Sequence, residues 1–236
     1  MTSPATKWGT RAADVYDRAY AERYRARDEA AAEDRAIVGV GAWLSGICDR
    51  AAEPIDVLDL GCGTGRYFRF VRHARTLVGV DVSKPMLGLA RRPVGTVTAA
   101  SVRLVEADFL QAGFEPGEFD VIYSIGVLGE HTPFDATVAA RVRSWLRPGG
   151  RFAFTTVDVR CPSIPRTMTR RVAEWLAPFS GPFRRTLRAR LLSGGLYADR
   201  EWLQDVLSTA GFAVESIESF QSDVHLHLLA VAKAAA

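Results

Sequence analysis

The sequence predicts an α/β fold in which a mostly parallel β-sheet carries helices on both faces, and three observations lead to this prediction. From residue 55 onward, short apolar segments of strand length alternate with helix-like segments. The first of these strands runs directly into a glycine-rich loop. The last two strands are separated only by a short turn, so they must pair as a hairpin, which places one antiparallel strand in the sheet.

Each element has a local signal along the chain. Residues 11–47 contain few helix breakers, and Tyr16, Tyr20 and Tyr24 recur every four residues, which predicts one or two helices before the sheet. We expect strands at residues 55–60, 76–80, 102–105, 119–124, 151–157, 212–218 and 224–232. We expect helices at residues 66–73, 84–91, 134–146 and 199–210, the third ended by Pro148-Gly149-Gly150 and the last by Gly211.

The predicted organisation is an N-terminal helical cap at residues 1–50 and one domain at residues 51–236. A segment at about 158–197 is too long for an ordinary connection, so we interpret it as a helical lid inserted into that domain.

The composition is that of a globular protein, with 48% hydrophobic and 24% charged residues among 236. No apolar run is long enough to span a membrane, and no secretory signal is visible at the N-terminus. Cys48, Cys62 and Cys161 are odd in number and widely spaced, which fits neither a disulfide framework nor a paired zinc site. We therefore expect a cytoplasmic protein without a metal site.

The glycine loop Gly61–Gly65 lies between the first strand and the next helix, where a backbone without Cβ atoms allows a ligand to approach closely. Asp59 precedes the loop, and Asp81 closes the second strand, at the spacing from which a carboxylate reaches ribose hydroxyls. Arg66 stands where a dinucleotide fingerprint has its third glycine. The loop therefore suits a nucleoside ligand without a pyrophosphate.

Five segments continue this pattern in order. They are VLDLGCGTG at 57–65, GVDVSKPML at 79–87, EADF at 106–109, FDVIYSIGVLGEH at 119–131 and LRPGGRFAF at 146–154. The series resembles that of the class I S-adenosylmethionine-dependent methyltransferases of the small-molecule type. The resemblance implies a Rossmann-like seven-stranded sheet with an antiparallel last strand, and S-adenosyl-L-methionine as the cofactor.

The resemblance also implies roles for individual residues. Asp59 and the backbone of Gly61 and Gly63 would hold the methionine part of the cofactor, and Asp81 would accept hydrogen bonds from both ribose hydroxyls. The adenine would be bound by Asp108, by the backbone N–H of Phe109 and by packing against Met86, while Ile125 and Gly126 would line the sulfonium. Cys62, Val82 and Ser124 complete the predicted cofactor-binding set. The structural alternatives are helix capping for Asp59, a turn or loop position for Asp81 and Asp108, and helix core for Met86.

His131 follows the fourth strand and is the residue we predict as catalytic, because an imidazole near neutral pH can take a proton from the acceptor. The alternative is that His131 only packs at the start of the next helix. A metal site formed by Glu130 and His131 is disfavoured, because adjacent residues rarely chelate one ion without further ligands. His225 and His227 alternate on the last strand, and we interpret them as structural or rim residues, with a role in acceptor binding as the alternative.

Between residues 160 and 190 the chain has eight arginines and a single acid, Glu174. Two short amphipathic helices in this insert would close over the site. We predict that the acceptor is bound by Tyr16, Tyr20, Tyr24, His131, Arg166 and Arg170. The alternatives are a solvated basic face and a membrane-surface element, and we expect neither nucleic-acid binding nor stable membrane insertion.

The sequence-based prediction is methyl transfer from S-adenosylmethionine to an oxygen or nitrogen of a small, anionic or polar metabolite, such as a natural product. Non-methyl chemistry on the same scaffold, a lipid or quinone acceptor at a membrane surface and a non-catalytic binding module are the alternatives. The oligomeric state is left open, with a homodimer as one option.

Overall fold

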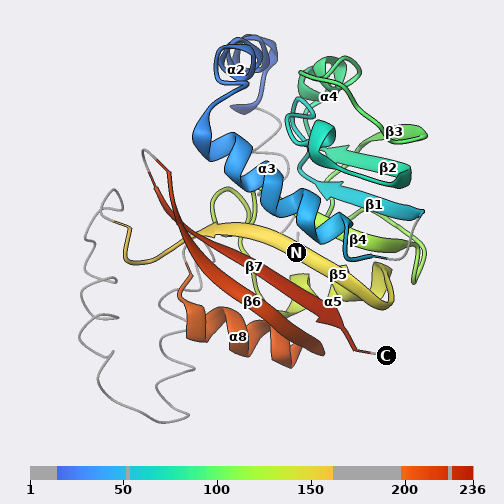
Figure 1. The fold of residues 1–236 in the computed structure, drawn as a ribbon, viewed down its shortest axis with the longest axis vertical. Coiled ribbons are helices and arrows are strands. Elements are labelled where there is room, and N and C mark those ends of the chain that lie inside the picture. Colours follow the sequence, from blue (N-terminus) through green and yellow to red (C-terminus); the bar gives the residue numbers. More distant parts are fainter. Residues whose placement is uncertain (1–14, 52–53, 162–197, 223–224, 236) are drawn as a thin grey trace, which may run out of the picture.

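The computed structural model describes residues 15–51, 54–161, 198–222 and 225–235, and the described residues form one sheet covered by helices (Figure 1). Its seven strands have the order β3-β2-β1-β4-β5-β7-β6. They are β1 Ile55–Leu60, β2 Ala74–Asp81, β3 Ser101–Glu106, β4 Phe119–Ser124, β5 Leu146–Val157, β6 Phe212–Gln221 and β7 Leu226–Ala234. The pairs among β1 to β5 are parallel, and β7 runs antiparallel to both β5 and β6. The predicted sheet and its hairpin are confirmed.

The described helices start at polar caps, as the sequence suggests. They are α2 Arg18–Ala30, α3 Arg35–Cys48, α4 Lys84–Ala90, α5 Ala136–Trp145 and α8 Arg200–Thr209. A carboxylate or hydroxyl at each N-cap accepts a backbone N–H of the first turn, from Asp17, Asp34, Ser83, Asp135 and Asp199 respectively. Of the one or two helices expected before the sheet, the structure describes two, α2 and α3.

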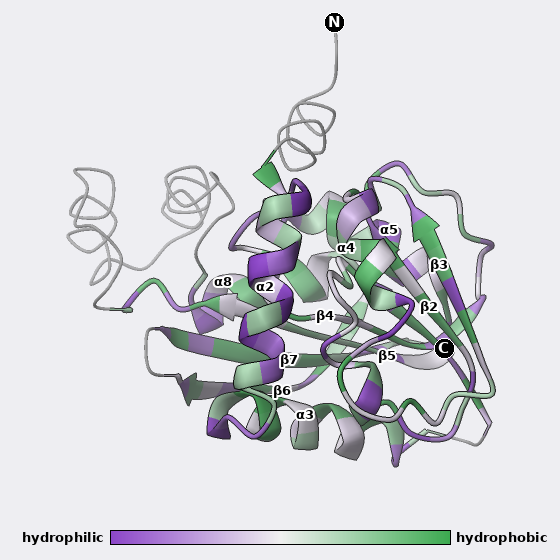
Figure 2. Ribbon diagram, turned by 90° about the horizontal axis from the view of Figure 1, so that it is seen from above, coloured by the Kyte–Doolittle hydropathy of each residue, from purple (hydrophilic) through white to green (hydrophobic). Residues whose placement is uncertain are grey.

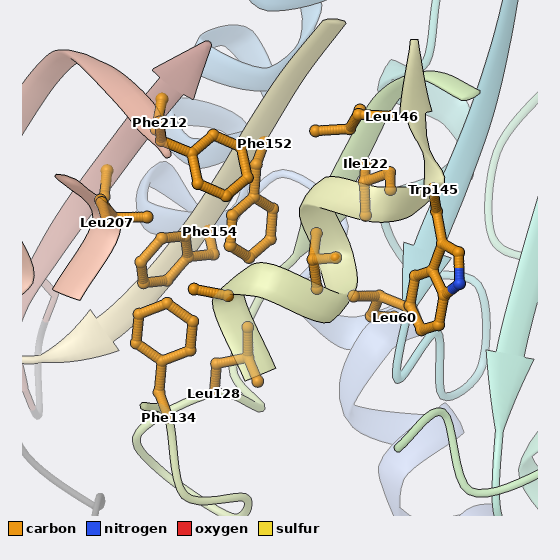
Figure 3. Close-up of a cluster of buried hydrophobic side chains, with 14 of the residues drawn as sticks. Leu60, Ile122, Leu128, Phe134, Trp145, Leu146, Phe152, Phe154, Leu207 and Phe212 are labelled. Carbon is orange, nitrogen blue, oxygen red and sulfur yellow. The ribbon is translucent and has the colours of Figure 1, made fainter. Parts of the chain in front are cut away.

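Two hydrophobic cores lie on opposite faces of the sheet, and each depends on its own helices. One contains residues of α5 and α8 with aromatic rings from the sheet, where the Phe134 and Phe154 centroids are 4.7 Å apart (Figure 3). The other contains Leu44 and Ile47 of α3, Phe68 and residues of α4. By contrast, α2 is mostly hydrophilic along its length (Figure 2) and approaches α4. Burial on both faces explains why apolar residues predominate in the central strands β1, β2 and β4.

The helix predicted at residues 66–73 is wrong, because the structure has only a single 3-10 turn there, η1 Phe68–Phe70. Gly65 adopts φ +76°, and β2 already begins at Ala74, which leaves little room for helical turns. The buried Phe68 ring packs against the Gly79 backbone, where an added Cβ would lie only 2.8 Å from it. Packing of this aromatic ring onto β2 thus replaces the expected helix.

Strand β5 begins at Leu146, five residues before the predicted start at Arg151. Leu146 pairs with Phe119 of β4, and the register then shifts before Arg151 pairs with Val121. The Pro148–Gly150 segment does end the helix, but it lies inside an irregular strand and not in a loop.

The predicted cap and lid are described only in part. The structure contains α2 and α3, whereas residues 1–14 and most of the 158–197 insert lie outside the described residues. At the base of that insert, Asp158 and Ala198 form an isolated parallel bridge, so its two ends are adjacent. Among the described helices, none has the length and apolar character needed to cross a membrane.

Candidate cofactor and acceptor site

A cavity opens at the carboxyl ends of β1, β2 and β4, where an α/β sheet binds its ligands. Almost all of the predicted site residues that the structure describes line it. They are Asp59, Gly61, Cys62, Gly63, Asp81, Val82, Met86, Asp108, Phe109, Ile125 and Gly126 from the cofactor set, with Tyr16, Tyr20, Tyr24 and His131 from the acceptor set. Residues that are far apart in sequence thus meet at one place, although their individual roles stay predictions.

Ser124 is the exception, because it is fully buried behind the cavity wall and is absent from the lining residues. Its Oγ donates a hydrogen bond of 2.9 Å to the carbonyl of Leu60, so it joins β4 to β1. Sequence reasoning also missed some lining residues, namely Thr64, Arg66, Tyr67, Leu110, Val127 and Thr132. Thr64, Leu110, Val127 and Thr132 are each adjacent to a predicted residue, whereas Arg66 and Tyr67 lie three and four residues after Gly63, so a wider window around the motifs would have found them.

The backbone of the glycine loop adopts conformations that favour glycine. Gly61 and Gly63 have φ values of +78° and +54°, in the left-handed region that favours glycine. A Cβ on Gly61 would lie 2.5 Å from Val127 Cγ2, whereas a Cβ on Gly63 would meet nothing closer than Met86 Cε at 4.0 Å. Gly61 is therefore needed for close packing, and Gly63 leaves its backbone open to a ligand.

Asp81 is held in one orientation at the end of β2. Its Oδ2 accepts a hydrogen bond of 2.9 Å from the N–H of Gly63, and its Oδ1 accepts one of 2.8 Å from the N–H of Ser83. Burial raises the pKa of Asp81, while these N–H donors act in the opposite direction. The carboxylate is thereby linked to the glycine loop and fixed at the cavity wall.

Asp59 is 4% exposed and lies beneath the same loop. Burial raises the pKa of Asp59 to about 8, and the charge of the Asp81 carboxyl adds to the rise. Without a cationic partner, this carboxyl is therefore mostly protonated at neutral pH. A ligand ammonium group beside it would favour its ionised form.

A third wall follows β3. Asp108 Oδ1 accepts a hydrogen bond of 2.9 Å from the N–H of Leu110, which fixes the turn after the strand. Met86 of α4 and Phe109 are 5% and 6% exposed, and both line the cavity. An apolar surface beside a carboxylate is suited to a flat, hydrogen-bonding base such as adenine.

Helix α2 and the residues before it form the outer wall. The Tyr20 and Tyr24 rings are stacked with centroids 5.9 Å apart, and the Tyr16 ring meets Tyr20 edge-on at 5.0 Å. Burial, together with the neighbouring tyrosines, raises the pKa of Tyr16 to about 12, so its hydroxyl remains protonated. The three tyrosines predicted from their spacing thus gather at the cavity.

One ionic contact connects α2 to the glycine loop. The buried carboxylate of Asp28 accepts hydrogen bonds from the Thr64 hydroxyl and, at 2.5 Å, from Arg66 Nε. The Arg66 guanidinium also lies 4.6 Å from the centroid of the Tyr24 ring, a cation–π arrangement. Arg66, which stands at the position of a missing glycine, therefore holds the outer wall in place.

His131 lies on the loop after β4, and its side chain is exposed at the cavity. Its backbone N–H donates to the carbonyl of Val127 at 2.9 Å, and its ring meets Tyr16 edge-on at a centroid distance of 6.0 Å. The predicted base is thus at the site. Arg166 and Arg170 lie outside the described residues, and Arg160 is paired with the buried Asp158.

Comparisons with known proteins agree with this geometry. Residues 57–150 match the family described as methyltransferase domain. The chain is similar to a ubiquinone biosynthesis O-methyltransferase of Methylococcus capsulatus, at 35% identity over 105 residues that cover 43% of each protein. It is also similar to the nocamycin O-methyltransferase of Saccharothrix syringae, at 36% identity over 43% of this chain and 37% of that protein. The matched part therefore spans less than half the length of these curated relatives.

A solved structure shares the fold along most of the chain. The S-adenosylmethionine-dependent methyltransferase from Mesorhizobium loti superposes with a TM-score of 0.60 at 24% identity, covering 84% of this chain and 99% of that one. The motif series, the order of the strands and the family match thus agree, and the resemblance noted in the sequence is confirmed. The described residues have the class I, Rossmann-like fold of the S-adenosylmethionine-dependent methyltransferases, and residues 57–150 match a methyltransferase domain.

Proposed function

We propose that this protein transfers a methyl group from S-adenosylmethionine to an oxygen or nitrogen of a small molecule. The observation that carries the proposal is that a fixed carboxylate, Asp81, and an exposed imidazole, His131, line the same cavity. Curated relatives named as O-methyltransferases support the choice of oxygen over nitrogen.

The residues present fit the cofactor. Gly63 presents an open backbone, Asp81 offers an oriented acceptor for ribose hydroxyls, and the apolar wall formed by Met86 and Phe109 is suited to adenine. Asp59 is placed to pair with the amino group of the methionine part. When bound, S-adenosylmethionine supplies a methyl group already activated on a sulfonium.

The chain has two tasks in such a reaction: to align the acceptor with the methyl group and to keep water out. The tyrosines of α2 and the preceding turn cover one side of the cavity and are held there by the Asp28–Arg66 contact. His131 is the base in this proposal, taking the proton that the acceptor loses. The preference for an anionic acceptor rests on arginines outside the described residues, and no stable partner other than the small-molecule acceptor is proposed.

The cofactor half of the proposal is tested by replacing Asp81. Asp81→Ala removes the acceptor for the ribose hydroxyls and should abolish S-adenosylhomocysteine binding in calorimetry. Asp135→Asn is the control, because it keeps a good N-cap on α5 outside the cavity. If Asp81→Ala still binds S-adenosylhomocysteine with micromolar affinity, the assignment of the cofactor site is refuted.

The transfer step is tested by methyl release from labelled S-adenosylmethionine in the presence of acceptor pools. Replacing His131 with Ala should slow turnover about 10²-fold at unchanged cofactor affinity. An unchanged rate would reassign His131 to packing, while methyl transfer itself would stand.

A further inference from the structure

A second cavity adjoins the first one on the side of the sheet hairpin. Ile125, Gly126 and His131 line both cavities, so the two spaces meet beside the loop that follows β4. The second cavity lies among α3, the β6–β7 hairpin and this loop. A molecule held in it would therefore be adjacent to the proposed cofactor site.

One side of this second cavity is apolar, whereas the rest of its wall is polar. Ile37 and Val40 of α3 face Phe220 of β6 and Leu229 of β7 across it. Helix α3 approaches the hairpin closely, since a Cβ on Gly39 would lie 3.3 Å from the Phe220 ring. A cavity with an apolar, partly aromatic side and a few polar groups opposite it is suited to a ring compound that carries a polar substituent.

At one end of the wall, two buried polar atoms face each other at ion-pair distance without a hydrogen bond. Glu130 Oε1 and His227 Nδ1 are 3.5 Å apart and shielded from solvent, and neither makes a hydrogen bond with the described part of the chain. The other ring nitrogen of His227, Nε2, lies 3.4 Å from the Ser222 hydroxyl. Because this contact is not a hydrogen bond, both atoms keep the capacity to bind a ligand group between them.

The hydrogen-bonding properties of Glu130 and His227 favour one kind of ligand group. A hydroxyl can donate its hydrogen to the carboxylate of Glu130 and accept a hydrogen bond from Nδ1–H of His227. A carboxylate or phosphate would be repelled by Glu130. In the described wall, Arg66 is the sole arginine or lysine, and its charge is already paired with Asp28.

We propose that the second cavity binds the methyl acceptor through an uncharged ring that carries a hydroxyl, with this hydroxyl held between Glu130 and His227. The inference rests on the proposed function and adds the acceptor class and two specificity-determining residues. His227, interpreted from sequence as a structural or rim residue, becomes a binding residue.

The test measures the binding of three matched probes to the full chain saturated with S-adenosylhomocysteine. The probes are 2-naphthol, 2-methoxynaphthalene, which lacks the hydroxyl hydrogen, and the anion 2-naphthoate. We expect 2-naphthol to bind about tenfold more tightly than either of the others, the worth of one hydrogen bond. Fluorescence titration of the naphthalene ring gives all three affinities.

Two variants and one control test whether the preference for 2-naphthol depends on Glu130 and His227. In His227→Ala the advantage of 2-naphthol over its methyl ether should disappear while S-adenosylhomocysteine affinity is unchanged. In Glu130→Gln the binding of 2-naphthoate should improve, because the repelling charge is gone while the shape is kept. His225→Ala is the control, since this histidine immediately precedes β7 and is outside the residues that line the cavity.

The outcomes separate the two proposals. Failure of 2-naphthol to bind, binding of 2-naphthoate as tight as that of 2-naphthol, or equal effects of His227→Ala and His225→Ala would each overturn this inference. If S-adenosylhomocysteine binds normally in the same samples, the proposed methyl transfer is unaffected. If the unaltered chain does not bind S-adenosylhomocysteine, the proposed function is refuted. A thermal melt of each variant monitors folding, and Glu130→Gln alone carries the test if His227→Ala unfolds.

Discussion

Cofactor binding should expel a proton from Asp59, and the size of the effect follows from its burial. With a pKa of about 8, the carboxyl is about 0.9 protonated at pH 7. The ammonium group of the bound cofactor favours the ionised carboxylate, so binding releases about 0.9 proton. The ligand amine, with an ordinary pKa of about 7.7–8.0, takes up about 0.1 proton as it becomes fully charged. The net release is therefore about 0.8 proton per cofactor bound.

Titration calorimetry with S-adenosylhomocysteine in buffers of different ionisation enthalpy measures this number from the slope of the apparent binding enthalpy. In Asp59→Asn, which keeps the shape of the side chain and cannot ionise, the release from this site should vanish. Asp135→Asn, at the exposed N-cap of α5, should behave like the unaltered protein. A slope of zero in the unaltered chain, or the same slope in Asp59→Asn, would refute the assignment of the proton to Asp59.

The same substitution should stabilise the protein in the absence of cofactor. The folded-state pKa of Asp59 lies above its ordinary value of about 3.9 in an unfolded chain. Between these two values the folded state binds more protons, so stability falls as the pH rises from about 4 to about 8. Asp59→Asn removes this decline, and its melting temperature should exceed that of the unaltered chain by more at pH 8 than at pH 5.

Two further predictions concern the loop and the wall around the cavity. Gly61→Ala should cost about 2–4 kcal/mol in urea unfolding, because its φ is +78° and the added Cβ would clash with Val127 at 2.5 Å. Adding Val127→Ala should recover only the part due to the clash, so complete recovery would contradict the backbone argument. Asp28→Ala leaves the half-buried Arg66 without its carboxylate and should cost about 2–4 kcal/mol while weakening S-adenosylhomocysteine binding. The exposed neighbour Glu29 provides the comparison, and equal losses in Glu29→Ala would show that the buried contact is not the cause.

The sequence was sufficient for features that depend on local patterns. The short turn between the last two strands predicted the antiparallel β7, and the glycine loop with Asp81 predicted the place of the cavity. Both signals are local, because strand length, turns and glycine spacing are set by neighbouring residues. The failed helix at residues 66–73 shows the limit, since packing of Phe68 onto Gly79 of the next strand decides the conformation there.

The second cavity could not be predicted for the same physical reason. Glu130 and His227 are nearly a hundred residues apart, and only the insertion of β7 beside β5 brings them within 3.5 Å. The contact of Asp28 with Arg66 likewise depends on how α2 lies against the loop. Motifs mark the residues that bind a shared cofactor, whereas the acceptor side is assembled from positions that no motif connects.

The place of β7 in the sheet also has a consequence for how the chain is made. Strand β5 pairs with β4 on one side and with β7 on the other. Arg151 of β5 pairs with Lys233 of β7, so β5 is synthesised long before its partner strand. Until residues 226–234 leave the ribosome, one edge of β5 is open and the aromatic side chains Phe152 and Phe154 lack part of their cover. We therefore expect the open edge of β5 to favour aggregation of the nascent chain until β7 pairs with it and closes the sheet.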